Sequence, residues 1–177
     1  MPNRLIKNIM RIIWFRKPVK YAKWIGVTIG NDCKIINHPD WSSEPYLISI
    51  GNHTEISFGV SFLTHDGATW ISRNDKKYIN NEILKFGCIK IGNDCFIGCR
   101  SIILPNVTIG DKVIIAAGSV VTKSVPSGEV WGGVPARKIM DSEEYLQKCA
   151  ESNKIDTVKL KKNKRKELER VFSKYLL

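Results

Sequence analysis

The sequence predicts a mainly β fold in which short parallel strands wind into a β-helix, and three observations indicate it. An aliphatic anchor returns at every sixth position through one stretch: Ile91, Ile97, Ile103, Ile109, Ile115 and Val121. A small or β-branched residue follows each anchor by four positions: Cys95, Ser101, Val107, Val113, Ser119 and Val125. Neither the helical period of 3.6 nor the strand period of 2 produces this spacing. Six anchors in phase also argue against sandwich strands that are aliphatic by chance.

Each six-residue unit is therefore expected to form one short strand and a corner, and three units close one triangular coil. Coils stack about 4.8 Å apart with their anchors inside. At 177 residues the chain is long enough for one domain with a sizeable core.

The first 24 residues place aliphatic side chains near helical spacing, with basic residues between them. One interpretation is an interfacial amphipathic helix that touches an anionic membrane. The other, which is favoured, is a helix that caps the open end of the coil stack, as terminal units must shield the last apolar layer. Both can hold at once.

Residues 25–139 contain the repeats. They begin at Ile29 and Ile35, are interrupted over residues 37–45, and resume from Ile50. At His65 the repeat stops again, and residues 66–88 are polar, charged and out of phase. This segment is too long for a corner and is predicted to be an extruded loop, where function usually lies.

Residues 140–177 are predicted to be helical, with a basic second helix that continues to Leu177. The net charge of +11 is concentrated at the two ends of the chain and indicates an anionic partner, such as a phosphate-bearing cofactor or a membrane surface. Because no nucleic-acid motif accompanies the basic tail, a solvated helix is expected there, and no nucleic-acid partner.

The five cysteines lack zinc-type spacing and are interpreted as reduced packing residues of a cytoplasmic protein. No apolar run is long enough for a membrane span, and no cleavage site follows the basic start, so export is not expected. Peripheral contact with the inner face of the membrane stays open through the N-terminal segment.

Three histidines are present, and each follows an anchor position by three residues, which predicts side chains that point away from the column: His38, His53 and His65. A zinc site built from histidines shared between subunits is one possible use. However, His53 and His65 are twelve residues apart, on different faces of one coil, and no metal is expected.

His65 differs from the other two because it stands where a coil opens into the long loop. A neutral imidazole there can take a proton from an alcohol near neutral pH. An acid or a carbonyl must hold its other ring nitrogen, and both Asp66 and Glu44 are candidates.

The repeats IGNDCF, IGCRSI and IGDKVI, the run IIAAGSVVTKSVP and the closing GGVPARKI resemble the hexapeptide-repeat acyltransferases. The likeness is to the branch of maltose, galactoside, xenobiotic and capsular-polysaccharide acetyltransferases, and it covers about residues 25–139. It implies a left-handed β-helix, a homotrimer, acetyl-CoA in the groove between neighbouring columns, and one essential histidine, which His65 matches.

The resemblance also assigns residues to the cofactor. Cys99 stands where relatives usually have Ala or Ser beside the pantetheine arm, which is a departure from the family pattern. Ala117, Thr122 and Lys123 match positions that contact the amides and phosphates of the cofactor. Two residues near the end of the repeats complete the set: Arg137, which matches the basic residue near the 3′-phosphate, and Trp131, which could stack on adenine.

The segments SSEPYLISIG and FLTHDGATW resemble those of saccharide-modifying members, and they assign Glu44, Tyr46 and Asp66 to the acceptor. The expected reaction is O-acetylation of a saccharide in surface-polysaccharide biosynthesis. His65 acts as general base, attack on the thioester is direct, and a backbone N–H of the neighbouring column stabilises the oxyanion. N-acetylation of an amino sugar or an antibiotic is one alternative, and a non-catalytic β-helix scaffold is another.

Overall fold

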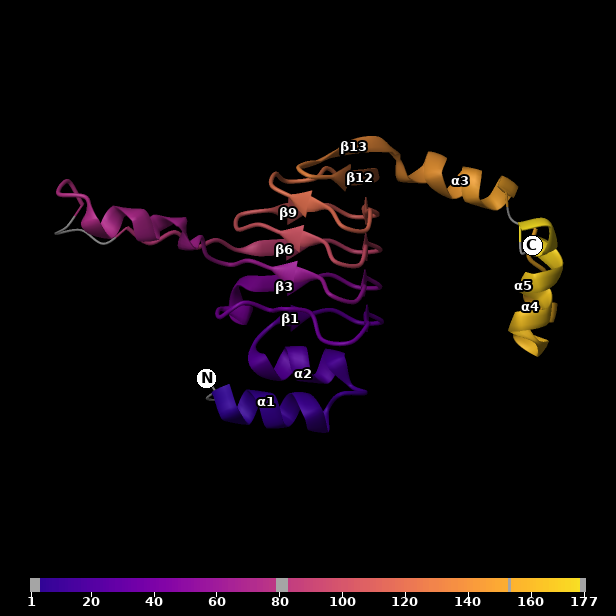
Figure 1. Cartoon of the computed structure of the whole chain (residues 1–177), viewed down its shortest axis with the longest axis horizontal. Helices are drawn as coiled ribbons and strands as arrows, with labels where there is room; N and C mark the ends of the chain where they lie inside the picture. The colour runs from indigo at the N-terminus through magenta and orange to yellow at the C-terminus, as the bar shows by residue number, and fades with distance from the viewer. Residues whose placement is uncertain (1–3, 79–82, 153, 176–177) are drawn as a thin grey trace. The chain divides into compact units, whose positions relative to one another are not determined.

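The computed structural model describes residues 4–78, 83–152 and 154–175. The chain forms two compact units, Met1–Ser142 and Glu143–Leu177. The first contains a column of stacked coils with three faces, each of which is a sheet of mainly parallel strands. Figure 1 shows the column from the side, with β1, β3, β6 and β9 stacked along it. The N-terminal helices belong to the same unit as the column.

Each face of the column is one sheet. The first contains β1 (Thr28–Ile29), β3 (Ile48–Ile50), β6 (Ile89–Ile91) and β9 (Thr108–Ile109). The second contains β2 (Lys34–Ile35), β4 (Glu55–Ile56), β7 (Phe96–Ile97), β10 (Ile114–Ile115), β12 (Glu129–Gly133) and β13 (Ala136–Asp141). The third contains β5 (Ser61–Phe62), β8 (Ile102–Ile103) and β11 (Val120–Val121).

The chain visits the three sheets in turn, so each strand pairs with the strand one coil further on. Ile97 of β7 lies beside Ile115 of β10, which is three six-residue units later in the sequence. Among the strands that the structure describes, every pairing is parallel except β12 with β13, an antiparallel hairpin that closes the stack. The expected coil of three units is confirmed.

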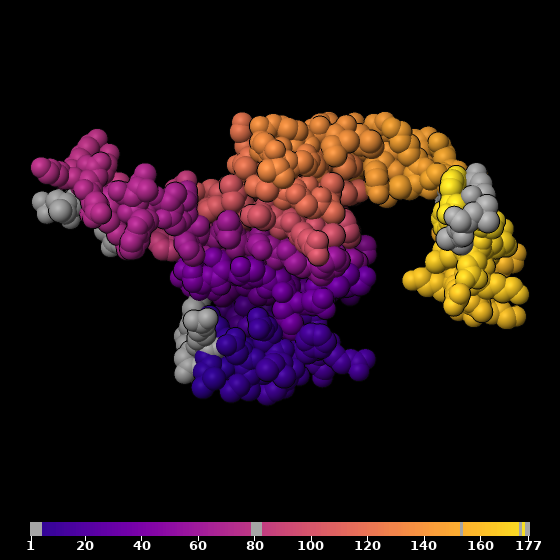
Figure 2. All heavy atoms as spheres, viewed as in Figure 1, coloured from indigo at the N-terminus to yellow at the C-terminus, as the bar shows by residue number. Residues whose placement is uncertain are grey.

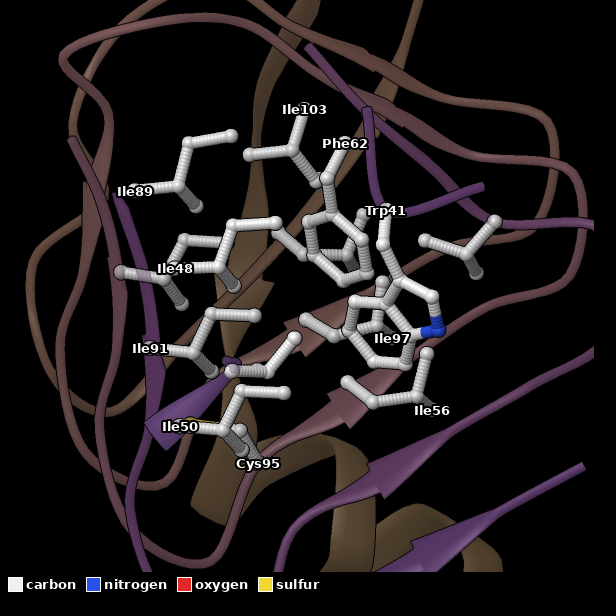
Figure 3. Packing of buried hydrophobic residues seen from close by; sticks show 14 of the residues in the cluster. Trp41, Ile48, Ile50, Ile56, Phe62, Ile89, Ile91, Cys95, Ile97 and Ile103 are labelled. Carbon is white, nitrogen blue, oxygen red and sulfur yellow. The ribbon is translucent and has the colours of Figure 1, made fainter. Parts of the chain in front are cut away.

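The predicted anchors form the core. All six, from Ile91 to Val121, are at most 4% exposed, and the residues four positions after them are at most 3% exposed. Figure 3 shows Ile91, Ile97, Ile103 and Cys95 among the side chains that converge inside the column. Burial of an aliphatic side chain contributes roughly 1.5–3 kcal/mol, so the layers of the core stabilise the column along its length.

The interruption expected over residues 37–45 begins later than predicted, because Trp41 continues the six-residue spacing of Ile29 and Ile35. Asp40 pairs in parallel with Ser61. Trp41 therefore lies next to Phe62, in the preceding coil and on the same face of the column. The two rings stack with centroids 5.0 Å apart, and Trp41 is 4% exposed (Figure 3). The chain leaves the column after Trp41, through the short 3-10 helix η1 (Pro45–Leu47).

Glycines after the anchors allow close stacking at the corners. A Cβ on Gly98 would lie 2.5 Å from the backbone nitrogen of Ala117 in the next coil. The coil spacing therefore leaves no room for a side chain at this position.

Two helices precede the first coil: α1 (Arg4–Ile13) and α2 (Pro18–Ile25). Helix α2 covers the end of the column with Tyr21, Ala22 and Ile25, all buried, and ends at Gly26 in the left-handed conformation. Helix α1 lies on the outer side of α2 (Figure 1) and packs mainly through Met10. The expected cap is therefore formed by α2.

The expected loop leaves the column at residue 66 and returns at β6. It contains the 3-10 helix η2 (Gly67–Asn74), and Figure 2 shows it in magenta as an arm that projects from the side of the column. The arm exposes several apolar side chains, among them Trp70 and Ile71.

The second unit follows β13, and the elements described in it are all helical. They are α3 (Ser142–Ser152), α4 (Thr157–Lys162), α5 (Lys164–Phe172) and the 3-10 turn η3 (Ser173–Tyr175). The single basic helix expected here is divided at Asn163, whose side chain accepts a hydrogen bond from the backbone of Lys166 and so begins α5.

Candidate active site

His65 lies at the corner that follows β5, where the arm leaves the column. Thr64, the residue before it, is fully buried and fixes the backbone, whereas the imidazole is 45% exposed. A side chain in this position is attached to a rigid backbone and is open to solvent on one side. Both are requirements for a group that must meet a substrate.

Glu44 lies directly beside this imidazole, with its Oε2 atom 3.0 Å from Nδ1 of His65. The repeat explains the contact, since Glu44 follows Trp41 by three residues as His65 follows Phe62. Both residues therefore occupy the same corner, one coil apart. Of the two acids that the sequence offered for orienting His65, the structure brings Glu44 to Nδ1.

The Glu44 carboxylate is well supplied with donors. Thr64 donates its hydroxyl to Oε2 at 2.7 Å. Partial burial acts to raise the pKa of Glu44, but the hydrogen bonds from Thr64, Ser43 and His65 outweigh it, and the pKa lies below its ordinary value. Glu44 is therefore a carboxylate at neutral pH and a hydrogen-bond acceptor for Nδ1–H of His65. In the tautomer with the proton on Nδ1, the lone pair of a neutral imidazole lies on Nε2.

Two serines that sequence reasoning did not select also lie at this nitrogen. The hydroxyl of Ser43 is 3.3 Å from Nδ1 of His65, and the hydroxyl of Ser42 is 3.5 Å away. Both follow Trp41, so recognition of Trp41 as an anchor would have found them together with Glu44. They lie on the Nδ1 side of the ring together with Glu44.

Asp66 forms its hydrogen bonds with residues of the arm. Its carboxylate accepts hydrogen bonds from Lys85 at 2.8 Å and from the backbone of Ala68 at 3.0 Å. The bond from Lys85 is the largest cause that lowers the pKa of Asp66. This ion pair joins the outgoing and returning ends of the arm. Tyr46, the third residue assigned to the acceptor, lies beside Gly26 at the end of α2.

Four of the six residues assigned to the cofactor lie along the two edges of the third sheet. Cys99 and Ala117 occupy one corner in successive coils, and the backbone of Gly118 donates to the carbonyl of Cys99 at 2.8 Å. Thr122 and Lys123 lie at the other edge, because they follow β11 as His65 follows β5. They share a corner with His65 and are two coils away, about 10 Å along the column at 4.8 Å per coil.

Arg137 and Trp131 lie on the closing hairpin. Arg137 is exposed and pairs with Gly132, where an added Cβ would lie 3.0 Å from Cβ of Ala116. Arg137 therefore continues the corner of Cys99 and Ala117. Trp131 donates its indole N–H to Glu129 at 2.6 Å and packs partly against the core.

The other histidines have different environments. His38 does not point into solvent as expected, because both of its ring nitrogens are buried and the ring packs edge-on against Tyr21 at 5.0 Å. Burial, followed by the charge of Arg11, lowers the pKa of His38. His53 is exposed and lies 2.8 Å from Asp94. Among the described residues, no group of three or more His, Cys, Asp or Glu side chains could hold a metal ion.

No helix within the described part of the chain has the length and apolarity needed to cross a bilayer.

Comparison with known proteins agrees with this architecture. The family model described as bacterial transferase hexapeptide (six repeats) matches residues 88–123. Protein CapG of Staphylococcus aureus is 52% identical over 144 residues, which cover 80% of this chain and 81% of that protein. Galactoside O-acetyltransferase of Escherichia coli (strain K12) is 33% identical over 141 residues, which cover 77% of this chain and 66% of that protein.

A solved structure of galactoside acetyltransferase in complex with coenzyme A has a TM-score of 0.56 and 24% identity to this chain. The match covers 81% of this chain and 82% of that one. This likeness is one of fold, and it confirms the parallel β-helix that the repeats predicted and the left hand that the family resemblance implied.

Proposed function

The chain belongs to the bacterial hexapeptide-repeat transferases, and on this premise we propose that it transfers an acetyl group from acetyl-CoA to a hydroxyl group of a saccharide. The observation that carries the proposal is the Glu44–His65 pair at the corner where the arm leaves the column. The relative that acetylates galactosides supports the choice of a saccharide. We place the reaction in the biosynthesis of a surface polysaccharide.

The pair supplies a general base. Nε2 of His65 accepts the proton of the acceptor hydroxyl as its oxygen attacks the thioester carbon, and Glu44 stabilises the imidazolium that forms. The new C–O bond replaces the C–S bond, and His65 returns the proton to the departing sulfur. A backbone N–H of the neighbouring column stabilises the oxyanion. The transfer is direct and needs no acetyl-enzyme.

The edges of the third sheet fit a long, anionic thioester. Exposed Ala117 and half-buried Cys99 leave a shallow corner that can accept the slender pantetheine arm. Lys123 follows β11 and Arg137 lies on the closing hairpin, so both are exposed cations near the C-terminal end of the column. Cations in these places are suitable partners for phosphate groups. Thr122 adds a hydroxyl beside Lys123, and Trp131 adds an aromatic ring on the hairpin.

We assign the working form to a homotrimer in which each site lies between two columns. A single column provides only one wall beside the open Nε2 side of His65. The outward positions of the third sheet include Ile102 and Val120, apolar side chains that a neighbouring column would cover. The trimer therefore completes the groove that acetyl-CoA needs.

Peripheral contact with an anionic membrane is also part of the proposal. Helix α1 exposes Leu5, Ile12 and Ile13 at 64–75%, whereas the buried helical residues described at this end of the column belong to α2. A groove of about 580 Å³ opens beside α2 and is lined by five cations: Arg16, Lys17, Lys20, Lys23 and Lys34. Apolar side chains next to clustered cations are typical of helices that lie in the bilayer interface.

The test is a transfer assay with labelled acetyl-CoA and a panel of sugar nucleotides, polysaccharides and aminoglycosides, each run with wild type and with His65→Ala. Label in a saccharide ester, lost in the variant, is the expected result. Label in an amide would identify the acceptor as an amine. Binding of acetyl-CoA without transfer to any class, or no binding, would contradict the proposal.

A further inference from the structure

Phe86, on the returning end of the arm, forms an antiparallel pair with His65. The backbone of Gly87 donates to the carbonyl of Thr64 at 2.8 Å, and that of Asp66 donates to the carbonyl of Lys85 at 2.9 Å. These bonds flank the His65–Phe86 pair and do not belong to it. The pair is therefore of the non-hydrogen-bonded type, whose two side chains lie on the same face at the closest cross-strand distance.

The Phe86 ring accordingly lies next to the base. Its centroid is 6.0 Å from that of the His65 ring, and the two planes are tilted by 53°. An acceptor whose hydroxyl reaches Nε2 of His65 must therefore pass close to this ring.

The backbone around Phe86 is held on both sides. Lys85 is joined to Asp66 by the 2.8 Å ion pair that closes the arm. Gly87 is buried, and a Cβ on it would lie 2.5 Å from the side chain of Asn106. These contacts fix the position of the ring relative to the column, so Phe86 belongs to the rigid part of the site.

Phe86 does not contribute to the core. It is 49% exposed, whereas Phe62, in the strand before His65, is completely buried. Leu84, two residues earlier, is 61% exposed. An apolar ring kept half in water beside a general base offers its free surface to a ligand, since binding sites combine apolar walls with a few polar groups.

We propose that Phe86 is a stacking platform for the pyranose ring of the acceptor, and this assignment rests on the proposed saccharide acetylation. One face of a pyranose carries several C–H groups and is apolar, and its polarised hydrogens meet the negative face of an aromatic ring. Stacking on Phe86 places the hydroxyls at the rim of the sugar beside Nε2 of His65. The ring thereby selects a cyclic acceptor and orients it.

The test compares Phe86→Leu, which keeps an apolar side chain, with Phe86→Tyr, which keeps the ring. We expect Phe86→Leu to raise KM for the saccharide about tenfold, Phe86→Tyr to stay within about threefold of wild type, and KM for acetyl-CoA to change in neither. Phe172→Ala, which removes a ring of similar exposure (42%) in the second unit, is the matched control. A rise in KM for acetyl-CoA, or wild-type kinetics in Phe86→Leu, would overturn the platform.

A second measurement does not depend on turnover. Saturation of the aromatic protons of the full-length protein should transfer to the C–H protons of methyl galactoside, and this transfer should be several-fold weaker in Phe86→Leu at the same sugar concentration. No transfer in wild type, or transfer of wild-type intensity in the variant, overturns the platform even if saccharides are acetylated. Transfer that depends on Phe86 without any acetylation overturns the proposed reaction and leaves the platform standing.

Discussion

Glu44 lies one coil below His65 at the same corner of the column, and its Oε2 atom is 3.0 Å from Nδ1 of the imidazole. Two insertions into one repeat meet there, since the chain leaves the column after Trp41 and again after Phe62. The stacked rings of these two residues bring the insertions together. The pair of acid and base is therefore a direct product of coil stacking.

Replacement of His65 by Ala should reduce acetyl transfer about a hundredfold or more, as loss of a general base does. The imidazole is 45% exposed and contributes nothing to the core, so the variant should keep the wild-type unfolding temperature and oligomeric state. Steady-state kinetics and a thermal melt check the two parts. Turnover near the wild-type rate would rule out His65 as the base.

Replacement of Glu44 by Gln should lower kcat about tenfold to a hundredfold and leave KM for acetyl-CoA unchanged, because the amide cannot stabilise the imidazolium as the carboxylate does. Asp66→Asn is the comparison, since Asp66 was the other candidate for orienting His65 and instead binds Lys85. That variant should keep most of kcat. The reverse ranking in kcat would transfer the orienting role to Asp66.

The sequence specified the column well because its core is periodic. Every anchor from Ile91 to Val121 could be placed inside before the structure was known, as six-residue spacing leaves only one buried phase. The same logic failed at Trp41, since it lies within the polar, turn-rich residues that were interpreted as a break in the repeat. With Trp41 missed, Glu44 stayed one of two candidates for orienting His65 and could not be preferred to Asp66.

Other features are not encoded by spacing. His38 occupies a corner position that points outward, but α2 packs over it, and a contact between a helix and a corner leaves no periodic trace. Phe86 lies in the arm, where no repeat exists to give its register, so its pairing with His65 emerges only from the backbone hydrogen bonds. The residues assigned to the cofactor came from the family resemblance, and the structure adds their positions along the third sheet.

Replacement of Lys123 or Arg137 by Ala should raise KM for acetyl-CoA roughly two- to fivefold, as an exposed charge pair contributes up to about 1 kcal/mol. The effect on kcat should be smaller, because such a contact is equal in the ground state and the transition state. Lys112→Ala, an exposed cation at a corner away from the third sheet, serves as the control. Unchanged KM in both variants would mean that the cofactor binds elsewhere.

The second unit should lose stability in acid through Glu167. Its side chain is 2% exposed and binds Arg170 at 2.6 Å, and that contact, followed by the hydrogen bond from the backbone of Asp156, lowers the pKa of Glu167 from 4.5 to about 2. A lowered folded-state pKa contributes stability that is present above 4.5 and is lost as the pH falls toward 2.

Amide hydrogen exchange over α4 and α5, measured on the full-length protein, checks this prediction. At pH 6 we expect Glu167→Gln to exchange faster than wild type, and near pH 2 the difference should disappear. Glu169→Gln is the matched control, because this carboxylate lies on the same helix but its side chain is 51% exposed. Equal protection of wild type and Glu167→Gln at pH 6 would show that the buried carboxylate does not hold the two helices together.

Helix α1 should carry the chain to anionic membranes, since α2 already covers the column. Residues 4–23 contain seven cations and no acid, and each cation near an anionic surface contributes about 1 kcal/mol. In a trimer three copies act together, so weak single contacts become avid.

We expect salt-sensitive co-sedimentation with phosphatidylglycerol vesicles and none with phosphatidylcholine. The double variant Leu5→Ser with Ile12→Ser should weaken it without lowering the unfolding temperature, because these side chains are 67% and 75% exposed. Val158→Ser, at 76% exposure in the second unit, should bind as wild type does. Absence of vesicle binding at every salt concentration would leave α1 without a membrane role and would favour a soluble acceptor.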